Sequence, residues 1–400
     1  MSISTLLNRI IYKSRILLLR TLNEFVPKQD NKIVLSSLPD FSDNAKGLWE
    51  YLAGSEKYEP VWLFSDKSLV EKLSRENITC EYSWSWKGIK ALLTSRYIAC
   101  THSQHIAIKS SNQFLITLWH GMPLKSMGYI DNLCTKKDIK GFKTVSKKSD
   151  IFISTSPIMR YALASCFNID ARKVVITGQP RNDKLFSPED RAVLSRVCGK
   201  NLDAYDKLIL YCPTFRAGMG RVEGKKLDKN VFNFPDYQRN ELDELLKSHN
   251  ALLVIKLHPF EEKQYSGSEL DLPQNSVLVK SDAFNTNTVS MYDILGLFDV
   301  LVTDYSSIYF DYLLLDRPIV FVTSDLNTYK SGRGLIFEDY DFWTPGPKTK
   351  TFDEYVQCLR KCLQDKEYYK AERKLVNGLV NQYTDNRSAE RIMQCVEKTK

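Results

Sequence analysis

From about residue 32 onward, short apolar runs alternate with longer amphipathic stretches. In the first half, apolar runs of strand length lie at 32–38, 58–64, 96–101, 113–119, 151–154 and 173–177. Stretches with helical spacing separate them, for example at 44–54 and 68–75. Strands that alternate with helices indicate parallel βαβ units, so we expect a doubly wound α/β sheet.

The same alternation starts again in the second half. Strands are expected at 208–211, 251–257, 277–280, 300–303 and 318–322. Helices are expected at 238–248, 290–297, 306–316 and 352–364, followed by two more up to about residue 398. Residues 186–206 between the halves are polar and helix-like, and we place the domain junction there. In open α/β sheets ligands bind beyond the carboxyl ends of the strands, so the pattern predicts a site in the cleft between two domains.

The first 26 residues have a different pattern. Apolar residues recur there at helical spacing, while Arg9, Lys13 and Arg20 fall on another face. The basic residues interrupt the apolar run, which excludes a signal peptide and a spanning helix of ~20 apolar residues. Two alternatives remain: a helix that lies flat on anionic lipid, or one that docks on the protein's own core. Ile16 and Leu19 widen the apolar surface and favour the membrane.

Composition narrows the class of protein. Of the 400 residues 43% are hydrophobic and 26% charged, which excludes a disordered chain, a fibrous repeat and a polytopic membrane protein. The 56 basic and 48 acidic side chains give a formal net charge of +8, which fits an anionic partner: a nucleotide, a phosphorylated substrate, acidic lipid or nucleic acid. Nine cysteines without a CxxC pair are typical of reduced thiols in a cytosolic protein.

Two of the five histidines directly follow predicted strands. His120 precedes Gly121 after one strand, and His258 precedes Pro259 after a strand of the other half. A histidine at a strand end points into the cleft, and imidazole can accept or donate a proton near neutral pH. Either one alone is best explained as a surface histidine at a turn, but two in matching positions favour function.

Hydroxyl groups gather at a third strand end. Ser306 and Ser307 follow Thr303-Asp304-Tyr305 and open a predicted helix, where free backbone N–H groups and hydroxyls can hold a phosphate. Ordinary helix capping is the alternative explanation. Asp311 lies four residues after Ser307 on the same helix face, from which it could accept hydrogen bonds from a ribose or a polyol.

Cations complete the set of candidates. Pro213, Thr214 and Arg216 follow the strand at 208–211, and the turn at 178–180 presents Arg181 and Asn182. Arginine binds phosphate through two parallel hydrogen bonds, and threonine adds a hydroxyl donor. Cations, hydroxyls and two histidines that converge on one cleft suit a donor with a pyrophosphate bridge.

Several common motifs are absent from the sequence. It contains no Walker A motif, no GxGxxG after a strand, no protein-kinase set and no GxSxG. His102 and His105 have the spacing of a metal half-site, but carboxylate or thiolate partners at suitable spacing are missing. No metal site is therefore predicted.

The motifs taken together resemble the CDP-glycerol glycerophosphotransferases, which prime and polymerise wall teichoic acids and some capsules. The resemblance covers roughly residues 31–350, and its WHGxPLK and TDYSS elements are the most specific. The matching segments are 41–46, 119–125, 178–183, 213–216, 257–259, 303–307 with Asp311, 316–318, 325–329, Arg333-Gly334 and 345–347.

The resemblance implies a GT-B-like pair of Rossmann-type domains facing a cleft, with monotopic membrane attachment. It implies that an acceptor hydroxyl attacks the glycerol-bearing phosphate of CDP-glycerol and that CMP leaves. By resemblance His120 is the general base, and His258 stabilises charge on the pyrophosphate or on the leaving CMP. The residues expected to bind the donor are Trp119, Gly121, Met122, Pro123, Arg181, Pro213, Thr214, Arg216, Lys256, Leu257, Ser306, Ser307 and Asp311.

On this basis the chain divides into four parts. We expect a membrane-associating amphipathic helix at 1–30, an acceptor-side domain at 31–195, a nucleotide-donor domain at 205–375 and C-terminal helices at 376–400. We expect a peripheral protein on the cytoplasmic face of the membrane, with an anionic membrane surface and a lipid-linked or polymeric glycan acceptor as partners. No cofactor is required on this view, since CDP-glycerol is a substrate, and Mg²⁺ is possible but not indicated.

Two residues depart from the family pattern. Gln179 stands where an aromatic residue is expected, and Met122 replaces a small hydroxyl residue. Both touch the donor or acceptor pocket, so glycerol, ribitol and other alditols stay open as the transferred group. The acceptor, the oligomeric state and the choice between primase and small polymerase also stay open. A GT-B glycosyltransferase with a nucleotide-sugar donor and a non-catalytic nucleotide- or polyanion-binding protein are the alternative functions.

Overall fold

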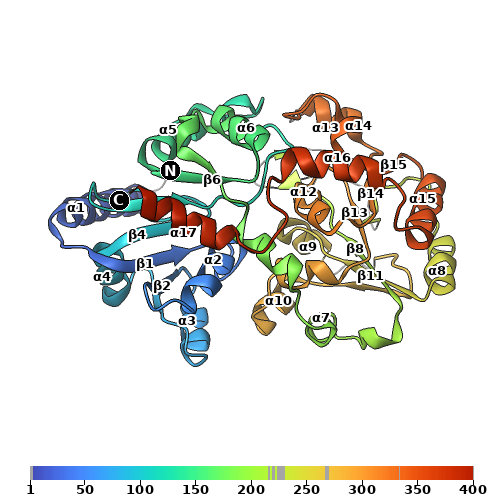
Figure 1. The fold of residues 1–400 in the computed structure, drawn as a ribbon, viewed down its shortest axis with the longest axis horizontal. Helices are drawn as coiled ribbons and strands as arrows, with labels where there is room; N and C mark the ends of the chain where they lie inside the picture. The colour runs from blue at the N-terminus through green and yellow to red at the C-terminus, as the bar shows by residue number, and fades with distance from the viewer. Residues whose placement is uncertain are drawn as a thin grey trace.

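The computed structural model describes residues 3–214, 217–218, 221–222, 230–265, 270–332 and 334–399. Two residues singled out from the sequence, Arg216 and Arg333, lie outside the described residues. The chain forms two lobes, each built around a parallel sheet (Figure 1). The N-terminal lobe contains β1 to β7 and the C-terminal lobe contains β8 and β11 to β15.

The first sheet has seven parallel strands in the order β3-β2-β1-β4-β5-β6-β7. Its central strands are buried on both faces, which is why they read as continuous apolar runs. The strands are β1 (Gln29–Ser36), β2 (Glu59–Phe64), β3 (Cys80–Tyr82), β4 (Ser95–Cys100), β5 (Phe114–Thr117), β6 (Ile151–Ser154) and β7 (Val174–Ile176). The helices between them are α2 (Asp43–Ala53), α3 (Lys67–Ser74), α4 (Trp86–Thr94), α5 (Lys136–Lys148) and α6 (Pro157–Phe167).

The second sheet has six parallel strands in the order β12-β11-β8-β13-β14-β15. Its strands are β8 (Lys207–Tyr211), β11 (Ala251–Ile255), β12 (Ser276–Leu278), β13 (Val300–Thr303), β14 (Ile319–Val322) and β15 (Lys348–Thr349). Two short strands, β9 (Ala217–Gly218) and β10 (Arg221–Val222), pair antiparallel outside it. The helices are α8 (Arg239–Ser248), α9 (Pro259–Tyr265), α10 (Ser281–Asn287), α11 (Met291–Ile294), α12 (Ile308–Tyr312), α13 (Leu326–Gly332), α14 (Tyr340–Trp343) and α15 (Phe352–Gln364).

The predicted α/β alternation is confirmed in both halves, with differences in individual elements. The sequence reading missed β3 with α4, and it missed the two-residue edge strand β15, because none of these contains a long apolar run. The helix expected at 306–316 is α12 followed by a 3₁₀ turn over Leu313–Leu315. The helix expected at 290–297 is likewise α11 followed by a 3₁₀ turn over Leu295–Leu297.

The domain junction contains a 3₁₀ segment over Pro180–Phe186 and helix α7 (Arg191–Cys198). An ion pair also joins the domains at this level: Lys46 Nζ of α2 lies 2.5 Å from Asp293 Oδ2 of α11, and both side chains are largely buried. Removing one partner of such a pair would leave an uncompensated buried charge, so the contact resists separation of the lobes.

The last two helices lead the chain back to the first lobe (Figure 1). Helix α16 (Lys370–Val380) runs beside α6, and Thr155 Oγ1 donates to the Val380 carbonyl at 2.6 Å. Helix α17 (Ser388–Lys398) buries Ala389, Ile392 and Met393 in the core of the N-terminal lobe. The chain therefore crosses between the lobes twice.

Helix α1 (Ile3–Phe25) packs against the N-terminal lobe on one side only. Leu19 is buried, and Asn23 Nδ2 donates to the Ile108 carbonyl and to Gln113 Oε1, both at 2.8 Å. The opposite side exposes apolar side chains at helical spacing, namely Leu7, Ile10, Ile11, Leu17, Leu18, Leu22 and Phe25, whereas the exposed Tyr12 lies on the docked side against Trp84. Docking on the core and an exposed apolar stripe thus occur in the same helix.

No helix in the described part of the chain combines the length and the apolar character needed to cross a membrane.

Candidate active site

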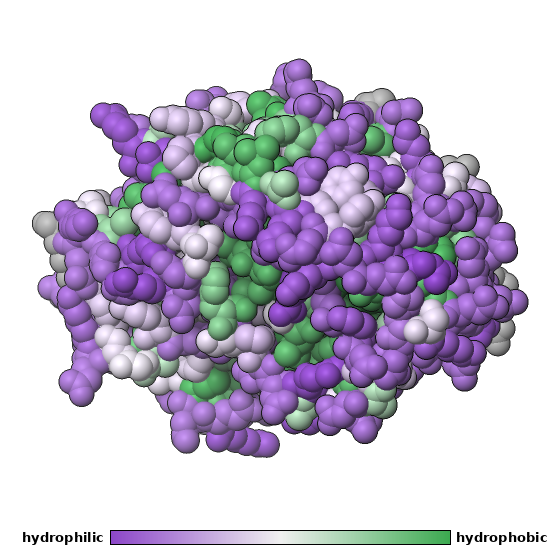
Figure 2. Space-filling view, turned by 45° about the vertical axis from the view of Figure 1, so that its right-hand side comes forward, coloured by the Kyte–Doolittle hydropathy of each residue, from purple (hydrophilic) through white to green (hydrophobic). Residues whose placement is uncertain are grey.

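A cavity of about 480 Å³ lies between the two lobes. The loops that line it follow the carboxyl ends of β5, β8, β11 and β13, the position at which open parallel sheets bind ligands. The space-filling view shows apolar residues gathered along the middle of the molecule, within a mainly hydrophilic surface (Figure 2). An apolar wall with a few converging polar groups is typical of a small-molecule site.

The cavity brings together nearly all the residues that the sequence singled out. Its lining includes both predicted catalytic histidines and the predicted donor-binding residues Trp119, Gly121, Met122, Pro123, Arg181, Pro213, Thr214, Lys256, Leu257, Ser306 and Ser307. Asp311 is not among the lining residues. Four further residues line the cavity that the sequence analysis did not single out. They are Lys125, which is the last residue of the WHGxPLK element, and Cys212, Met291 and Tyr292.

His120 is held in one orientation at the bottom of this cavity. Its ring lies between the ring of His102, stacked with centroids 4.0 Å apart, and the indole of Trp119 at 3.9 Å. His120 Nδ1 lies 3.4 Å from the carbonyl oxygen of Thr101, which can only accept, so Nδ1 carries the proton and Nε2 keeps its lone pair. Burial, with a smaller contribution from His102, lowers the pKa of His120 to about 3. The imidazole is therefore neutral near pH 7.

Trp119 is placed by an unusual backbone conformation. Its φ angle is +53°, in the left-handed region that a bulky residue rarely adopts. This turn follows directly on β5 and brings the indole against His120 on one side and against Phe167 on the other. Backbone strain of this kind is found mainly where function requires a particular side-chain position.

His258 occupies the matching strand end in the other lobe, in different surroundings. Burial, with smaller contributions from the charges of Lys125 and Lys256, lowers its pKa to about 4. Lys256 Nζ is held by Glu262, by the Leu257 carbonyl at 2.7 Å and by Ser281 Oγ at 3.1 Å. Lys125 forms a β-bridge with Leu335, so this cation too sits at a fixed place on the cavity wall.

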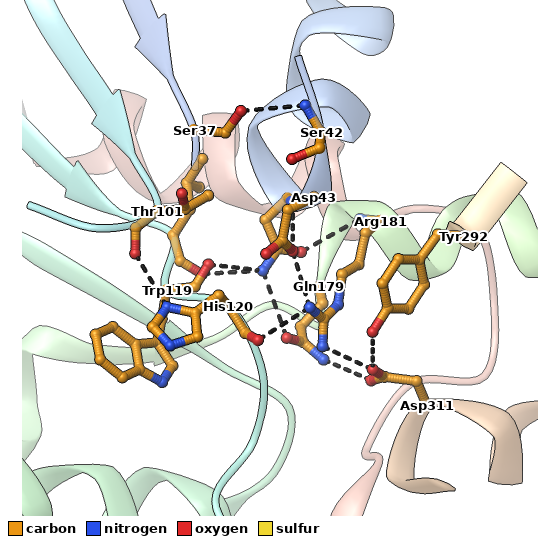
Figure 3. A network of polar contacts seen from close by, with 12 residues as sticks. Ser37, Ser42, Asp43, Thr101, Trp119, His120, Gln179, Arg181, Tyr292 and Asp311 are labelled. Carbon is orange, nitrogen blue, oxygen red and sulfur yellow. Dashed lines mark hydrogen bonds and ion pairs between the residues drawn. The ribbon is translucent and has the colours of Figure 1, made fainter. Parts of the chain in front are cut away.

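Arg181 lines the cavity and links the two lobes through its polar contacts (Figure 3). Its guanidinium donates to Asp43 Oδ1 at 2.8 Å, to the His120 carbonyl at 3.1 Å and to Asp311 Oδ2 at 2.7 Å, and it stacks on Tyr292 at 4.3 Å. Burial alone would lower the pKa of Arg181, but the charges of Asp311 and Asp43 raise it above its usual value. Arg181 therefore fixes the backbone of the His120 loop.

The carboxylate of Asp311 is directed at protein donors rather than at the cavity. It accepts hydrogen bonds from Gln179 Nε2 at 2.7 Å, Arg181 Nη2 at 2.7 Å, Asn182 Nδ2 at 2.8 Å and Tyr292 OH at 2.8 Å. Only 1% of the residue is exposed. The structure thus gives Asp311 a positioning role, in place of the predicted contact with a ribose or polyol.

Gln179, labelled in Figure 3, and Asn44 extend this network. Asn44 Nδ2 donates to the carbonyls of Leu118 and Trp119, at 3.1 and 3.2 Å, and lies 3.4 Å from Gln179 Oε1. Both amide side chains are fully buried. The glutamine that departs from the family pattern therefore connects the Trp119 loop to Asp311, and it does not line the cavity.

The lobes also approach each other closely at Gly121. A Cβ there would lie 3.1 Å from Ser307 Oγ and 3.2 Å from Arg181 Nη2, and the φ angle of +139° is one that side chains rarely adopt. Glycine at this position lets the loop after β5 reach the start of α12. The hydroxyls of Ser306 and Ser307 consequently lie in the same cavity as His120.

A second loop is held by the acidic residue of the TDYSS element. The Thr214 N–H donates to both carboxylate oxygens of Asp304, at 2.8 and 3.1 Å. This fixes Pro213 and Thr214 on the cavity wall next to Ser306 and Ser307. Helix α12 has only five residues, so its dipole is small. A phosphate bound there would be held mainly by the hydroxyl groups and by the loop N–H groups.

Within the described residues no three His, Cys, Asp or Glu side chains form a group that could hold a metal ion. The His102-x-x-His105 pair is used differently. His102 Nδ1 lies 2.8 Å from Thr101 Oγ1, and the His105 ring is buried, which lowers its pKa to about 4. Of this pair, His102 joins the network of the site, because its ring stacks on that of His120.

Comparison with known proteins gives consistent matches. The sequence model of the family described as CDP-glycerol:poly(glycerophosphate) glycerophosphotransferase matches residues 18–398. A teichoic acid glycerol-phosphate transferase of Staphylococcus aureus is 26% identical over 367 residues, which cover 90% of each chain. A teichoic acid ribitol-phosphate primase of Bacillus spizizenii is 25% identical over 392 residues, covering 93% of this chain and 92% of the other.

Among solved structures, the wall teichoic acid polymerase TagF superposes with a TM-score of 0.74 at 21% identity. The superposition covers 100% of this chain and 98% of that chain. At this identity the likeness shows the fold, and it confirms the predicted GT-B-like pair of α/β domains.

Proposed function

The chain belongs to the CDP-glycerol:poly(glycerophosphate) glycerophosphotransferase family, and from this we propose that it transfers an alditol phosphate from a CDP-alditol to an acceptor hydroxyl. The acceptor is a lipid-linked or polymeric glycan of the teichoic acid type, and CMP is released. The product contributes to a cell wall or capsule polymer.

One observation carries the proposal beyond family membership. A neutral histidine with a fixed tautomer lies in the same cavity as hydroxyls and cations from the opposite lobe. Phosphoryl transfer requires positioning and charge stabilisation more than covalent chemistry, and this cavity supplies both. His120, on the N-terminal lobe, lines the same cavity as Ser306, Ser307 and Thr214, on the C-terminal lobe.

The proposed reaction is a single displacement at phosphorus. The acceptor oxygen forms a bond to the phosphorus that carries the alditol, and the bond from that phosphorus to the oxygen bridging to CMP breaks. The hydroxyl proton moves to Nε2 of His120, and CMP departs with the bridging oxygen. The negative charge of a bound pyrophosphate stabilises the imidazolium and raises the low pKa of His120, so binding of the donor strengthens the base.

The opposite wall stabilises the charge of the donor. The Ser306, Ser307 and Thr214 hydroxyls are donors to phosphate oxygens, and Lys125 adds a positive charge beside His258. Arg181, through its contact with the His120 carbonyl, keeps the base in place. No cofactor enters this proposal, and retention of CMP release in EDTA would support that part of it. Activity that returns only with added Mg²⁺ would contradict it.

The decisive experiment measures CMP release from CDP-glycerol and CDP-ribitol with a panel of lipid-linked acceptors. We expect release from one of the two donors, dependent on acceptor and lost in His120→Asn. Relatives named for glycerol phosphate and for ribitol phosphate match this chain about equally, so the donor that works identifies the alditol. Release of UDP from UDP-sugars without CMP from either donor would instead identify a glycosyltransferase.

We further propose that helix α1 holds the protein on the cytoplasmic face of an anionic membrane. Its exposed apolar stripe, from Leu7 to Phe25, suits a helix that lies in the interface, and basic residues flank the stripe. Leu18→Glu should lower co-sedimentation with phosphatidylglycerol vesicles, whereas Leu375→Glu, an exposed leucine on α16, should not. These variants avoid truncation, which would remove the buried Leu19 and Asn23. Equal sedimentation of both variants and the wild type would exclude α1 as the anchor.

A further inference from the structure

A second, smaller cavity of about 180 Å³ lies beside the first. Trp119, His120 and Met127 line both cavities, so the base stands in their shared wall. The volume is roughly six times that of one water in the liquid, enough for a three-carbon polyol or part of a sugar ring. All residues that line it belong to the N-terminal lobe.

The chemistry of this small cavity differs from that of the donor cavity. Two carboxylates, of Asp131 and Asp138, line it together with the rings of Phe142 and Phe167. Carboxylates accept hydrogen bonds from hydroxyl groups, and aromatic faces pack on the apolar C–H faces of polyols and sugars. Trp119 lines the cavity too and adds a third aromatic ring to its wall.

The geometry of phosphoryl transfer also favours the small cavity as the acceptor site. In phosphoryl transfer the attacking and leaving oxygens lie roughly in line on opposite sides of the phosphorus. The groups suited to the donor and the leaving CMP, including Ser306, Ser307 and His258, stand on the C-terminal lobe. The attacking hydroxyl must then come from the N-terminal side, where the small cavity opens next to His120.

We propose that the small cavity binds the terminal hydroxyl-bearing unit of the acceptor, a polyol or a sugar, and that Asp131 and Asp138 select against a terminal phosphate. This inference rests on the proposed phosphotransferase function, since it assigns the acceptor of that reaction. It also gives the reaction a polarity: the chain end that grows is a free hydroxyl, and a phosphate-ended chain is rejected by like charge.

A variant that fills the cavity tests the assignment kinetically. Cys134 lines the small cavity and not the large one, so Cys134→Phe occupies space meant for the acceptor. We expect the KM for the acceptor to rise about tenfold or more while the Kd of CDP-glycerol stays within about twofold. Cys395→Phe, at a half-buried cysteine on α17 that lines neither cavity, controls for the added ring. An unchanged acceptor KM, or loss of CDP-glycerol binding, in Cys134→Phe would overturn the proposal.

A protection experiment tests the same site without turnover. The wild-type protein is alkylated with iodoacetamide, and modification of Cys134 is followed by peptide mass spectrometry. A glycerol phosphate trimer with a free terminal glycerol, and in a parallel arm N,N′-diacetylchitobiose, probe a polyol-phosphate chain and a sugar. We expect at least one of them to slow alkylation of Cys134 by about tenfold at saturation, and the trimer capped with a terminal phosphate to have no effect.

The two readouts separate failure of this inference from failure of the proposed function. If no CDP-alditol releases CMP while the uncapped probe still protects Cys134, the subsite stands and the donor assignment falls. If CMP is released but neither uncapped probe protects Cys134, or if the capped trimer protects as well as the uncapped one, the subsite is wrong and the phosphotransferase stands.

Discussion

His120 and His258 occupy equivalent places in the two lobes, each just beyond the carboxyl end of a parallel strand. Their surroundings nevertheless differ. His120 is enclosed by two rings and has its Nδ1 proton directed at a carbonyl, whereas His258 is half-buried beside two lysines. Burial is the main cause of the low pKa at both histidines; the neighbouring His102 lowers the pKa of His120 as well, and Lys125 and Lys256 lower that of His258.

The difference shows that position in the sheet does not determine the role of a histidine. A ring locked in one tautomer with a free lone pair is suited to accept a proton from a defined direction. A ring among cations is suited to donate a hydrogen bond to an anion, which would also raise its pKa. The repeated α/β architecture thus supplies two matching positions, and the neighbours give each a separate function.

The largest expected effect comes from removing the base. His120→Gln should lower kcat/KM by about 10²–10⁴, because an amide cannot accept the proton. The Kd of CDP-glycerol, measured by calorimetry, should change little. A loss of less than about tenfold in steady-state CMP release would move the base elsewhere in the cavity.

The matching change in the other lobe should cost less and respond to the replacement. His258→Ala should lower kcat/KM by about 10²-fold, the usual effect of losing one donor to a developing negative charge. His258→Gln should recover part of that loss, because an amide N–H can still donate to phosphate. Equal losses in His258→Gln and His258→Ala, measured side by side, would show that charge or proton transfer, not hydrogen bonding, is the contribution of His258.

The stacked partner of His120 should have a smaller influence. His102→Ala removes the ring that covers His120 and should lower kcat by about 3–10-fold, in line with roughly 1 kcal/mol for an aromatic pair. His102→Phe keeps the stacking surface but removes a group that lowers the pKa of His120. Since the base must be unprotonated, a higher pKa moves the acid limb of the kcat/KM profile to higher pH. A profile identical to that of the wild type would exclude this coupling.

The smallest expected effects concern the free energy of unfolding, which both histidines should make dependent on pH in the same direction. The pKa values of about 3 and 4 in the folded protein lie below the unfolded value near 6.5, so the unfolded chain binds more protons below pH 6.5. The stability of the wild type should therefore fall as the pH drops from 6.5 toward 4. His120→Gln should reduce the slope of stability against pH by up to about 1.4 kcal/mol per pH unit. His258→Gln should reduce it by less, because His258 is more exposed. Urea titrations at several pH values test the slopes, and unaltered slopes would contradict the burial of His120.

Most of the fold could be predicted from the sequence, because its strands are buried on both faces. Such strands appear as continuous apolar runs, and β6 and α15 were predicted with the bounds that the structure has. The strand β3 was missed because only one of its three residues is fully buried. The break of the 306–316 helix into α12 and a 3₁₀ turn was missed because the turn is only three residues long and all three are leucines, a run too short to tell a period of 3.0 from one of 3.6.

The members of the site were predictable, but not all of their roles. A strand end followed by Gly or Pro identifies a residue at the cavity, as at His120 and His258. The sequence could not show that the Asp311 carboxylate would be saturated by four donors, since those donors come from two other segments of the chain. Tyr292 was missed for the same reason. A tyrosine directly before the capping residue Asp293 has no distinctive signal until Arg181 is placed against it.

The return of α17 to the first lobe has a consequence for synthesis on the ribosome. The core of the N-terminal lobe includes Ala389, Ile392 and Met393, more than 200 residues after the end of β7. At typical translation speeds those side chains emerge roughly 10–40 s after the first sheet is complete. During that interval the nascent lobe exposes an apolar surface that only the end of the chain can cover, so a ribosome that stalls before residue 388 leaves a product with an open core and a target for chaperones and proteases.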